Sequence, residues 1–192
     1  MEPLWGWFSD FKKAFDLTVR RILVGKLCLY DTPDPVISWI IDFLTSRKQR
    51  VRLGHDCFSE WGVVPVGVPQ GSKLGPWLFI IMINELDVPA NDVWKYVDDT
   101  TISETISKNQ HSHIQAAVDS LVNRASVDKF QLNETKCKEL RINFSTKNTT
   151  SFDSVVVNGM PIELVASAKT LRLNVSSDLK CNSHIDSVIK QS

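Results

Sequence analysis

Two adjacent carboxylates, Asp98 and Asp99, stand in the run KYVDDTTI at residues 95–102. The residues on both sides favour extended strands, whereas Asp tolerates turn geometry, so the run predicts a β-hairpin with the acidic pair at its tip. Neighbouring carboxylates repel each other unless a cation neutralises them. Taken alone, the pair is more typical of a solvated surface turn than of a metal site. The choice between the two interpretations depends on which other groups converge on the hairpin.

A third carboxylate, Asp10, follows a short aromatic-rich segment at residues 4–8. This segment predicts a buried strand that delivers Asp10 at its carboxyl end. The predicted order of elements is strand, helix, an insert, helix, strand, strand, helix and strand. That order predicts the α+β class and, within it, a split βαβ (ferredoxin-like) antiparallel sheet with helices on one face. In such a sheet the first strand lies beside the hairpin, so Asp10 and Asp98 converge.

Converging carboxylates suggest a site for hard cations. Mg²⁺ prefers oxygen ligands and bridges carboxylates to phosphates, and two such ions ~3.5–4 Å apart can clamp an in-line phosphoryl displacement. Side chains of adjacent strand residues point to opposite faces. We therefore expect Asp98 to bridge the metals and Asp99 to be the weaker ligand.

The elements around these residues are predicted from periodicity and turn signals. Helices are expected at residues 12–29 (one helix or two short ones), from Asp34 as N-cap onward, at 72–86 (apolar nearly all round and therefore buried), and near 114–125. Strands are expected at residues 49–53, 58–64 and 139–144. Short strands after residue 148 predict a second, smaller β-rich module, so we expect domains at residues 1–147 and 148–192.

Charge and cysteine content narrow the possible functions. The 22 basic and 22 acidic residues cancel, so net charge alone gives no argument for nucleic-acid binding. A local basic stretch has two interpretations, a solvated strand edge or a phosphate contact; it comprises Arg47, Lys48, Arg50 and Arg52. The four cysteines lack the short spacing of a zinc or redox motif. With neither a secretory signal nor a long apolar run, we expect an intracellular protein, in the nucleus or cytoplasm, without membrane partners.

Four blocks of the chain resemble the palm of a reverse transcriptase. They are DFKKAFD (residues 10–16), GVPQG with LGP (67–71 and 74–76), YVDD (96–99) and LNETKC (132–137). Their order and spacing are most similar to LINE-type, non-LTR retrotransposons, and the resemblance covers nearly the whole chain from Phe8. It implies RNA-directed DNA synthesis: a primer 3′-hydroxyl attacks a dNTP with two Mg²⁺ (or Mn²⁺) ions, on an RNA template with a DNA primer. The oligomeric state stays open.

The resemblance also implies roles for single residues. Asp10, Asp98 and Asp99 are the implied metal ligands, joined by the backbone carbonyl of Phe11. The other implied roles are Phe15 beneath the incoming sugar, Gln70 and Gly71 against the nucleotide and template base, Lys136 as proton donor to pyrophosphate, and Lys169 and Arg172 at a primer-gripping turn. Phe15 is also compatible with a core aromatic, and Lys136 with a solvated surface lysine.

The sequence departs from the family pattern at several points. Only nine residues precede Asp10, where the family carries fingers residues that hold the triphosphate. Arg172 stands where a glycine is expected and Cys181 where a tryptophan is usual. We therefore expect a truncated palm with the start of a thumb. Two hypotheses follow: a polymerase domain, or a catalytically inactive remnant that at most binds nucleic acid weakly.

Overall fold

The structure is a computed structural model, and it describes residues 4–9, 11–88, 92–107, 110–143 and 153–189. The chain forms two compact units, each assembled from segments that are separated in sequence. Unit 1 comprises Met1–Lys12, Leu86–Ser126 and Gln131–Ser192, and unit 2 comprises Lys13–Glu85 and Val127–Phe130. Among the described residues, no helix is both long and apolar enough to cross a membrane.

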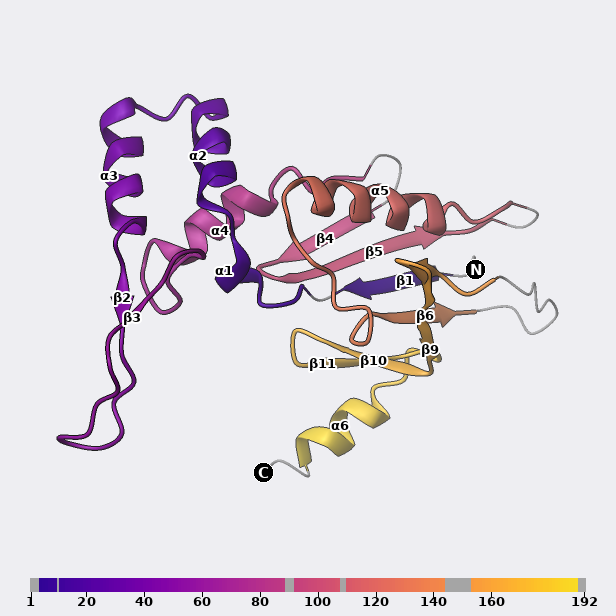
Figure 1. Cartoon of the computed structure of the whole chain (residues 1–192). Coiled ribbons are helices and arrows are strands. Elements are labelled where there is room, and N and C mark those ends of the chain that lie inside the picture. Colours follow the sequence, from indigo (N-terminus) through magenta and orange to yellow (C-terminus); the bar gives the residue numbers. More distant parts are fainter. Residues whose placement is uncertain (1–3, 10, 89–91, 108–109, 144–152, 190–192) are drawn as a thin grey trace. The chain divides into compact units, whose positions relative to one another are not determined.

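A five-stranded sheet forms the centre of unit 1, with strand order β4-β5-β1-β6-β9 (Figure 1). Its strands are β1 (Leu4–Ser9), β4 (Asp92–Tyr96), β5 (Asp99–Thr105), β6 (Lys138–Ile142) and β9 (Glu163–Val165). Neighbouring strands are antiparallel except for β6 and β9. β1 is therefore hydrogen-bonded along both edges, between β5 and β6.

Helix α5 (Ile114–Val127) runs alongside β4 and β5 (Figure 1). Its buried side chains recur at helical spacing, as in Ile114, Val118 and Leu121. Along β5, Thr100 and Ile102 are buried, as expected for a strand with one face on a core. Sheet and helix together confirm the predicted α+β class.

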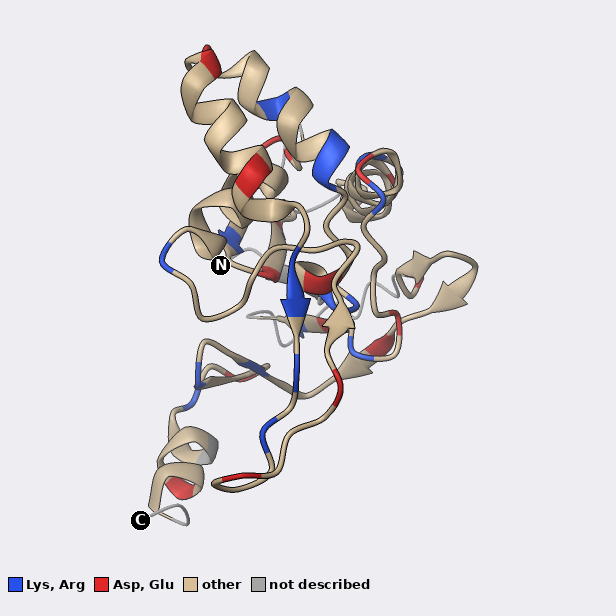
Figure 2. Ribbon diagram, turned by 60° about the vertical axis from the view of Figure 1, so that its left-hand side comes forward, with Lys and Arg blue, Asp and Glu red and all other residues tan. Residues whose placement is uncertain are grey.

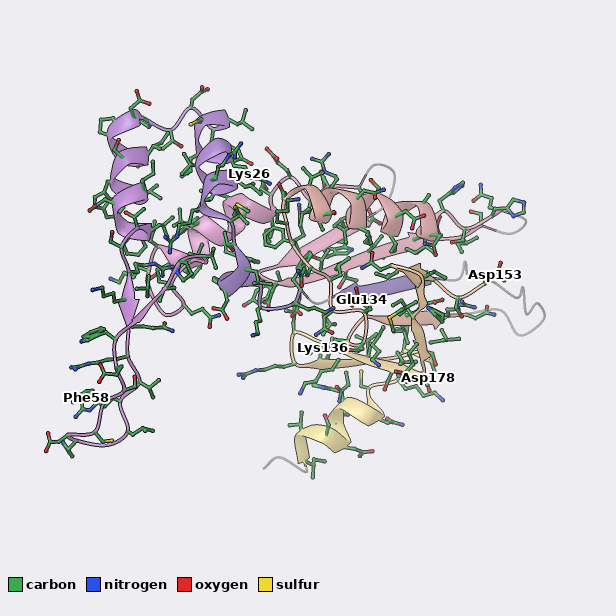
Figure 3. All side chains as sticks on the ribbon, in the orientation of Figure 1. Lys26, Phe58, Glu134, Lys136, Asp153 and Asp178 are labelled. Carbon is green, nitrogen blue, oxygen red and sulfur yellow. The ribbon has the colours of Figure 1, made fainter. Side chains whose placement is uncertain are left out.

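A buried carboxylate ties β6 to the segment that follows residue 152. Glu139 has no exposed surface, so its charge requires polar partners. Its carboxylate accepts a hydrogen bond from the backbone N–H of Val155 at 3.0 Å and pairs with the Arg141 guanidinium. Arg141 in turn donates to the carbonyl of Asp153, labelled in Figure 3.

Two short hairpins and a helix follow in unit 1: β7 (Val156–Val157) with β8 (Met160–Pro161), β10 (Ser167–Thr170) with β11 (Leu173–Ser176), and α6 (Asn182–Ile189). The predicted turn at Asn158-Gly159 is confirmed, with φ of +50° and +79°. The turn between β10 and β11 has the same left-handed φ pattern, at Leu171 (+47°) and Arg172 (+68°). Arg172 thus adopts the backbone conformation that glycine favours, although it has a side chain.

Glu134 joins three segments of unit 1. Its carboxylate accepts a hydrogen bond from Lys12 Nζ at 2.8 Å and another from the side-chain amide of Asn158 at 2.7 Å. These two hydrogen bonds lower the pKa of Glu134 from 4.5 to about 2. The carboxylate therefore links the residues after β1, the loop before β6 and the β7–β8 turn.

Unit 2 contains four helices in its described residues: α1 (Ala14–Leu17), α2 (Arg20–Leu29), α3 (Asp34–Leu44) and α4 (Gly75–Ile83). The two-helix alternative for residues 12–29 is thus confirmed. The N-cap prediction was wrong by one residue, because the Pro33 carbonyl accepts the first helical bonds, from Val36 and Ile37. Full burial of the predicted helix at residues 72–86 was also wrong, since Trp77 on α4 is 67% exposed.

The predicted strands between α3 and α4 form a ribbon, which we define as residues 47–66. It consists of β2 (Lys48–Gln49), β3 (Gly62–Val63) and, further out, an isolated bridge between Arg52 and Phe58. In Figure 1 it continues from the end of α3.

A buried lysine holds residues 127–130 in unit 2. Lys26 on α2 is 4% exposed. Its ammonium donates to Asp128 Oδ2 at 2.6 Å and to the Met82 carbonyl at 2.7 Å, and lies 3.3 Å from Glu85 (Figure 3). Breaking a buried pair leaves an uncompensated charge, which is strongly destabilising. This interaction therefore fixes the short segment against α2 and α4.

We expect the substitution Arg172→Gly to stabilise the protein. A non-glycine residue in the left-handed region costs on the order of 1 kcal/mol, and glycine removes that cost. The free energy of unfolding, measured by urea titration, should rise by about 1 kcal/mol. The matched control is Gly159→Arg, at the same position of the β7–β8 turn, where a Cβ would meet no atom within 4 Å. That control should lower stability by a similar amount; equal stability of both variants and the parent would contradict the assignment of turn strain.

Glu134 should make stability depend on pH. Its pKa is about 2 in the folded protein against 4.5 ordinarily, so the unfolded chain binds the proton more readily. The stabilisation is complete above about pH 4.5 and is lost as the pH falls toward 2. Relative to the parent, Glu134→Gln should be less stable at pH 6 and converge with it near pH 2. Urea midpoints measured between pH 2 and pH 7 test this, and two parallel curves would contradict it.

Candidate active site

The predicted acidic hairpin is formed by β4 and β5. Tyr96 and Asp99 are the last paired residues, so Val97 and Asp98 make the two-residue turn. Asp98 is half-buried and Asp99 is exposed. Val97 has φ +55°, which is rare for a β-branched residue and indicates local strain. Strain of this kind concentrates at functional sites, and here it lies beside both carboxylates.

The strand that precedes Asp10 ends beside this hairpin. Ser9, the last residue of β1, pairs with Thr100, which directly follows Asp99 in β5. Asp10 itself lies outside the described residues. On its other side, Phe11 is buried and bridges to Leu132. The described neighbours of Asp10 are thus fixed to the acidic hairpin on one side and to the loop before β6 on the other.

The loop before β6 carries Lys136. Backbone N–H groups of Lys136 and Cys137 donate to the Asn133 carbonyl at 2.9 and 3.1 Å, which closes a tight turn. Lys136 is exposed, whereas Glu134 in the same loop binds Lys12 and Asn158 (Figure 3). In addition, the backbone N–H of Lys12 donates to the Gln131 carbonyl at 2.7 Å. The blocks at residues 96–99 and 132–137, together with residues 11–12 of the first block, therefore lie within unit 1.

The glycine-rich block lies in unit 2, against the residues after Asp10. The backbone N–H of Val68 donates to the Phe15 carbonyl at 2.8 Å, and that of Gly67 to the Thr18 carbonyl at 3.0 Å. A Cβ on Gly67 would lie 2.7–2.9 Å from backbone atoms of Phe15 and Asp16. No side chain fits this approach, so the first glycine of the block is required by packing.

The three predicted nucleotide-binding residues in unit 2 have different surroundings. Gln70 and Gly71 are exposed beyond this packed turn, and Gly71 has φ +78°. Phe15 is half-buried and stacks on Phe79, with ring centroids 4.4 Å apart. The ring of Phe15 therefore contributes to the core of unit 2. Nucleotide contact by these residues stays a prediction.

The predicted basic residues lie on the ribbon and on the β10–β11 hairpin, and two of them donate hydrogen bonds to backbone carbonyls. The Arg47 guanidinium donates to the Gly67 carbonyl at 2.7 Å, and Arg52 Nε donates to the Gly54 carbonyl at 2.8 Å. Burial lowers the pKa of Arg47, and the positive charge of Arg20 lowers it further. These two arginines shape the ends of the ribbon, whereas Lys48 and Arg50 are exposed along it. Lys169 lies on β10 and Arg172 in the following turn.

Sequence reasoning missed two kinds of residue. Glu134 was passed over because a single glutamate in a loop gives no signal of its two partners. Phe58 and Trp61 were passed over, although the Arg50 guanidinium lies 3.9 Å and 4.7 Å from their ring centroids. The sequence did contain a signal for these contacts. Basic residues occupy every second position of residues 48–52, and aromatic residues follow at 58 and 61.

The donor chemistry at the hairpin suits a hard cation. Asp98 and Asp99 supply carboxylate oxygens, the ligand type that Mg²⁺ and Ca²⁺ prefer. Within the described ranges, which omit Asp10, no group of three or more His, Cys, Asp or Glu side chains is arranged to hold a metal ion. The described residues thus fit part of a metal site, and a further ligand has to come from elsewhere.

Comparisons with known proteins identify the relatives of this chain. The family described as reverse transcriptase (RNA-dependent DNA polymerase) matches residues 2–167. A Drosophila melanogaster protein described as "Probable RNA-directed DNA polymerase from transposon X-element" is 35% identical over 89 residues, which are 46% of this chain and 9% of that protein. The matched segment therefore covers less than a tenth of the curated relative's length.

Solved structures show the same fold at low sequence identity. Apo telomerase from Candida tropicalis, truncated from its C-terminal domain, has a TM-score of 0.62 and 14% identity, covering 95% of this chain and 35% of that one. Telomerase from Candida albicans, in complex with a TWJ fragment of telomeric RNA, has a TM-score of 0.51 and 16% identity, covering 94% and 31%.

These comparisons confirm the predicted resemblance. Reverse transcriptases generally use divalent metal ions, in keeping with the carboxylates of the hairpin. The Drosophila relative is described as coming from a transposon. Since the family match covers most of its length, this chain belongs to the reverse transcriptase family.

Proposed function

We propose that this chain carries the palm-type catalytic centre of an RNA-directed DNA polymerase from a non-LTR retrotransposon. The observation that carries the proposal is the pairing of β1 with β5, which sets Ser9 beside Thr100 next to the acidic turn. The proposed palm is the split βαβ sheet, within a domain at residues 1–147, followed by a β-rich connection at residues 148–192. We place the protein inside the cell, in the nucleus or cytoplasm.

The proposed metal ligands are the carboxylates of Asp10, Asp98 and Asp99, with the Phe11 carbonyl as a further donor. Bound Mg²⁺, or Mn²⁺, in two positions would supply charge stabilisation for phosphoryl transfer. Asp98 is half-buried in the turn and acts as the central ligand, whereas the more exposed Asp99 holds its ion less firmly. The strained turn carries Asp98, and Asp99 follows it as the first residue of β5.

The remaining residues bind and orient the substrates. The oxygen of a primer 3′-hydroxyl bonds to the α-phosphorus of a dNTP and gives up its proton to water, while the bond from that phosphorus to pyrophosphate breaks. Lys136, exposed on the loop held by Glu134, donates a proton to the leaving pyrophosphate. Phe15 lies beneath the sugar, and Gln70 and Gly71 lie against the nucleotide and the template base.

Basic side chains contact the nucleic-acid strands in this proposal. Those assigned to phosphates are Arg47, Lys48, Arg50, Arg52, Lys169 and Arg172. Support for an RNA partner comes from the relatives: one is described as an RNA-directed DNA polymerase, and one telomerase was solved with telomeric RNA.

Asp98→Asn should abolish metal-dependent primer extension by the purified chain. Loss of a metal ligand removes several kcal/mol of transition-state stabilisation, so the extension rate should fall by at least about 100-fold. The assay combines the full chain, an RNA template with an annealed DNA primer, dNTPs and Mg²⁺. Titration of Mn²⁺ by electron paramagnetic resonance gives a second readout, in which the variant should bind more weakly.

A matched control is Asp87→Asn, which removes a carboxylate that is 82% exposed and 4.0 Å from Lys95. Exposed pairs of this length contribute little, so the control should extend primers like the parent. Extension by Asp98→Asn at the parental rate would overturn the assignment of the centre. A folded parent that never extends primers would favour the inactive-remnant hypothesis instead.

A further inference from the structure

The ribbon of unit 2 has a register that defines its two faces. Lys48 pairs with Val63 near its base, and Arg52 bridges to Phe58 further out. The last pair of β2 and β3 is Gln49 with Gly62, and the next pair along the ribbon is Arg52 with Phe58. Between these two pairs, residues 50–51 of the first arm lie opposite residues 59–61 of the second. The second arm therefore contains one extra residue, a β-bulge. Bulges increase local twist and re-aim the side chains beside them.

One face of the ribbon interleaves cations with aromatic rings. Side chains alternate along an extended chain, so Lys48, Arg50 and Arg52, at every second position of the first arm, are expected on one face. The Arg50 guanidinium carbon lies 3.9 Å from the centroid of the Phe58 ring and 4.7 Å from that of Trp61. The Arg52 guanidinium carbon lies 5.7 Å from the Phe58 centroid. Both rings are therefore on the basic side, and we call this surface the basic-aromatic face.

The rings of this face stay at the surface. Phe58 is 41% exposed and Trp61 is 58% exposed. An isolated two-stranded ribbon is only marginally stable in water, and the cation–π contacts help to hold this one together. They do not bury the rings, however, and exposed area on each ring remains available to a ligand.

The charge of the ribbon favours a polyanionic ligand. Residues 47–66 contain four Lys or Arg and two Asp or Glu, whereas the whole chain has no net charge. In Figure 2 the basic positions follow one arm of the ribbon. Among them, Lys48 and Arg50 are exposed, and the Arg50 guanidinium lies over both rings.

We propose that the basic-aromatic face binds single-stranded nucleic acid. Unpaired bases stack on Trp61 and Phe58, while Lys48 and Arg50 contact the phosphates between them. Every base presents a π-face, so such binding tolerates many sequences, and a duplex, whose bases already stack on one another, is a poorer ligand. The inference deepens the proposed function and rests on it in naming the unpaired RNA template as the strand bound.

Fluorescence anisotropy with the full chain and a labelled 12-nucleotide oligouridylate tests this. We expect Trp61→Ala and Phe58→Ala each to weaken binding about tenfold, because stacking on an aromatic side chain contributes this much per base. Trp61→Phe should retain most of the affinity. Lys48→Gln should flatten the dependence of binding on salt, since one phosphate contact is lost. An RNA duplex of the same length should bind at least about tenfold more weakly.

The matched control is Val51→Thr, which alters the opposite face of the ribbon where Val51 is 60% exposed. It should bind like the parent. Three results would overturn the inference: a folded parent without affinity for the oligonucleotide, unchanged affinity in both alanine variants, or an equal loss in Val51→Thr. The last result would point to general damage of the ribbon.

Asp98→Asn separates this inference from the proposed function. It should lose primer extension and keep its affinity for the oligonucleotide. If the polymerase assignment alone fails, the parent does not extend primers yet still needs Trp61 to bind RNA. If the ribbon inference alone fails, extension depends on Asp98 while Trp61→Ala and Phe58→Ala bind like the parent.

Discussion

The pairing of β1 along both of its edges is the constraint on which the acidic site depends. β5 lies on one edge and begins at Asp99, and β6 lies on the other and follows the loop of Lys136. Register is specified because a slip by one residue would turn buried side chains such as Ile102 and Leu140 toward the opposite face. The same interaction that completes the sheet thus gathers residues from three distant parts of the chain.

Backbone conformation sets apart two kinds of turn in this protein. At Gly67 the left-handed φ comes with an approach so close that no side chain fits. At Val97, Leu171 and Arg172 the same region of φ is occupied by residues with side chains, and the flanking strand pairs must hold them there. In the first kind of turn, close packing requires a glycine. In the second kind, the backbone is strained, and one of these strained turns carries Asp98.

The sequence predicted much of the fold and part of the site. Element types followed from periodicity, and the strand-favouring residues on both sides of the acidic pair correctly indicated a hairpin, although only Asp98 lies in its turn and Asp99 begins β5. Exposure on α4 could not be predicted, because an all-apolar pattern does not show which side meets other elements, and Trp77 is exposed. The linking role of Glu134 and the stacking of Arg50 on Trp61 were not predicted, because both depend on partners that only the folded chain brings together.

Unit 2 is completed by residues 127–130, which are synthesised long after the helices of that unit. The partner of Lys26, Asp128, is synthesised about a hundred residues later. The partners of β1 are also synthesised late, β5 after a similar interval and β6 later still. During synthesis, therefore, the first strand leaves the exit tunnel with both edges unpaired, and the buried ammonium has yet to meet its carboxylate. Contacts of such long range slow folding and expose strand edges to aggregation. The yield of folded chain should accordingly depend on the translation rate and on whether chaperones bind the N-terminal half before its partners are synthesised.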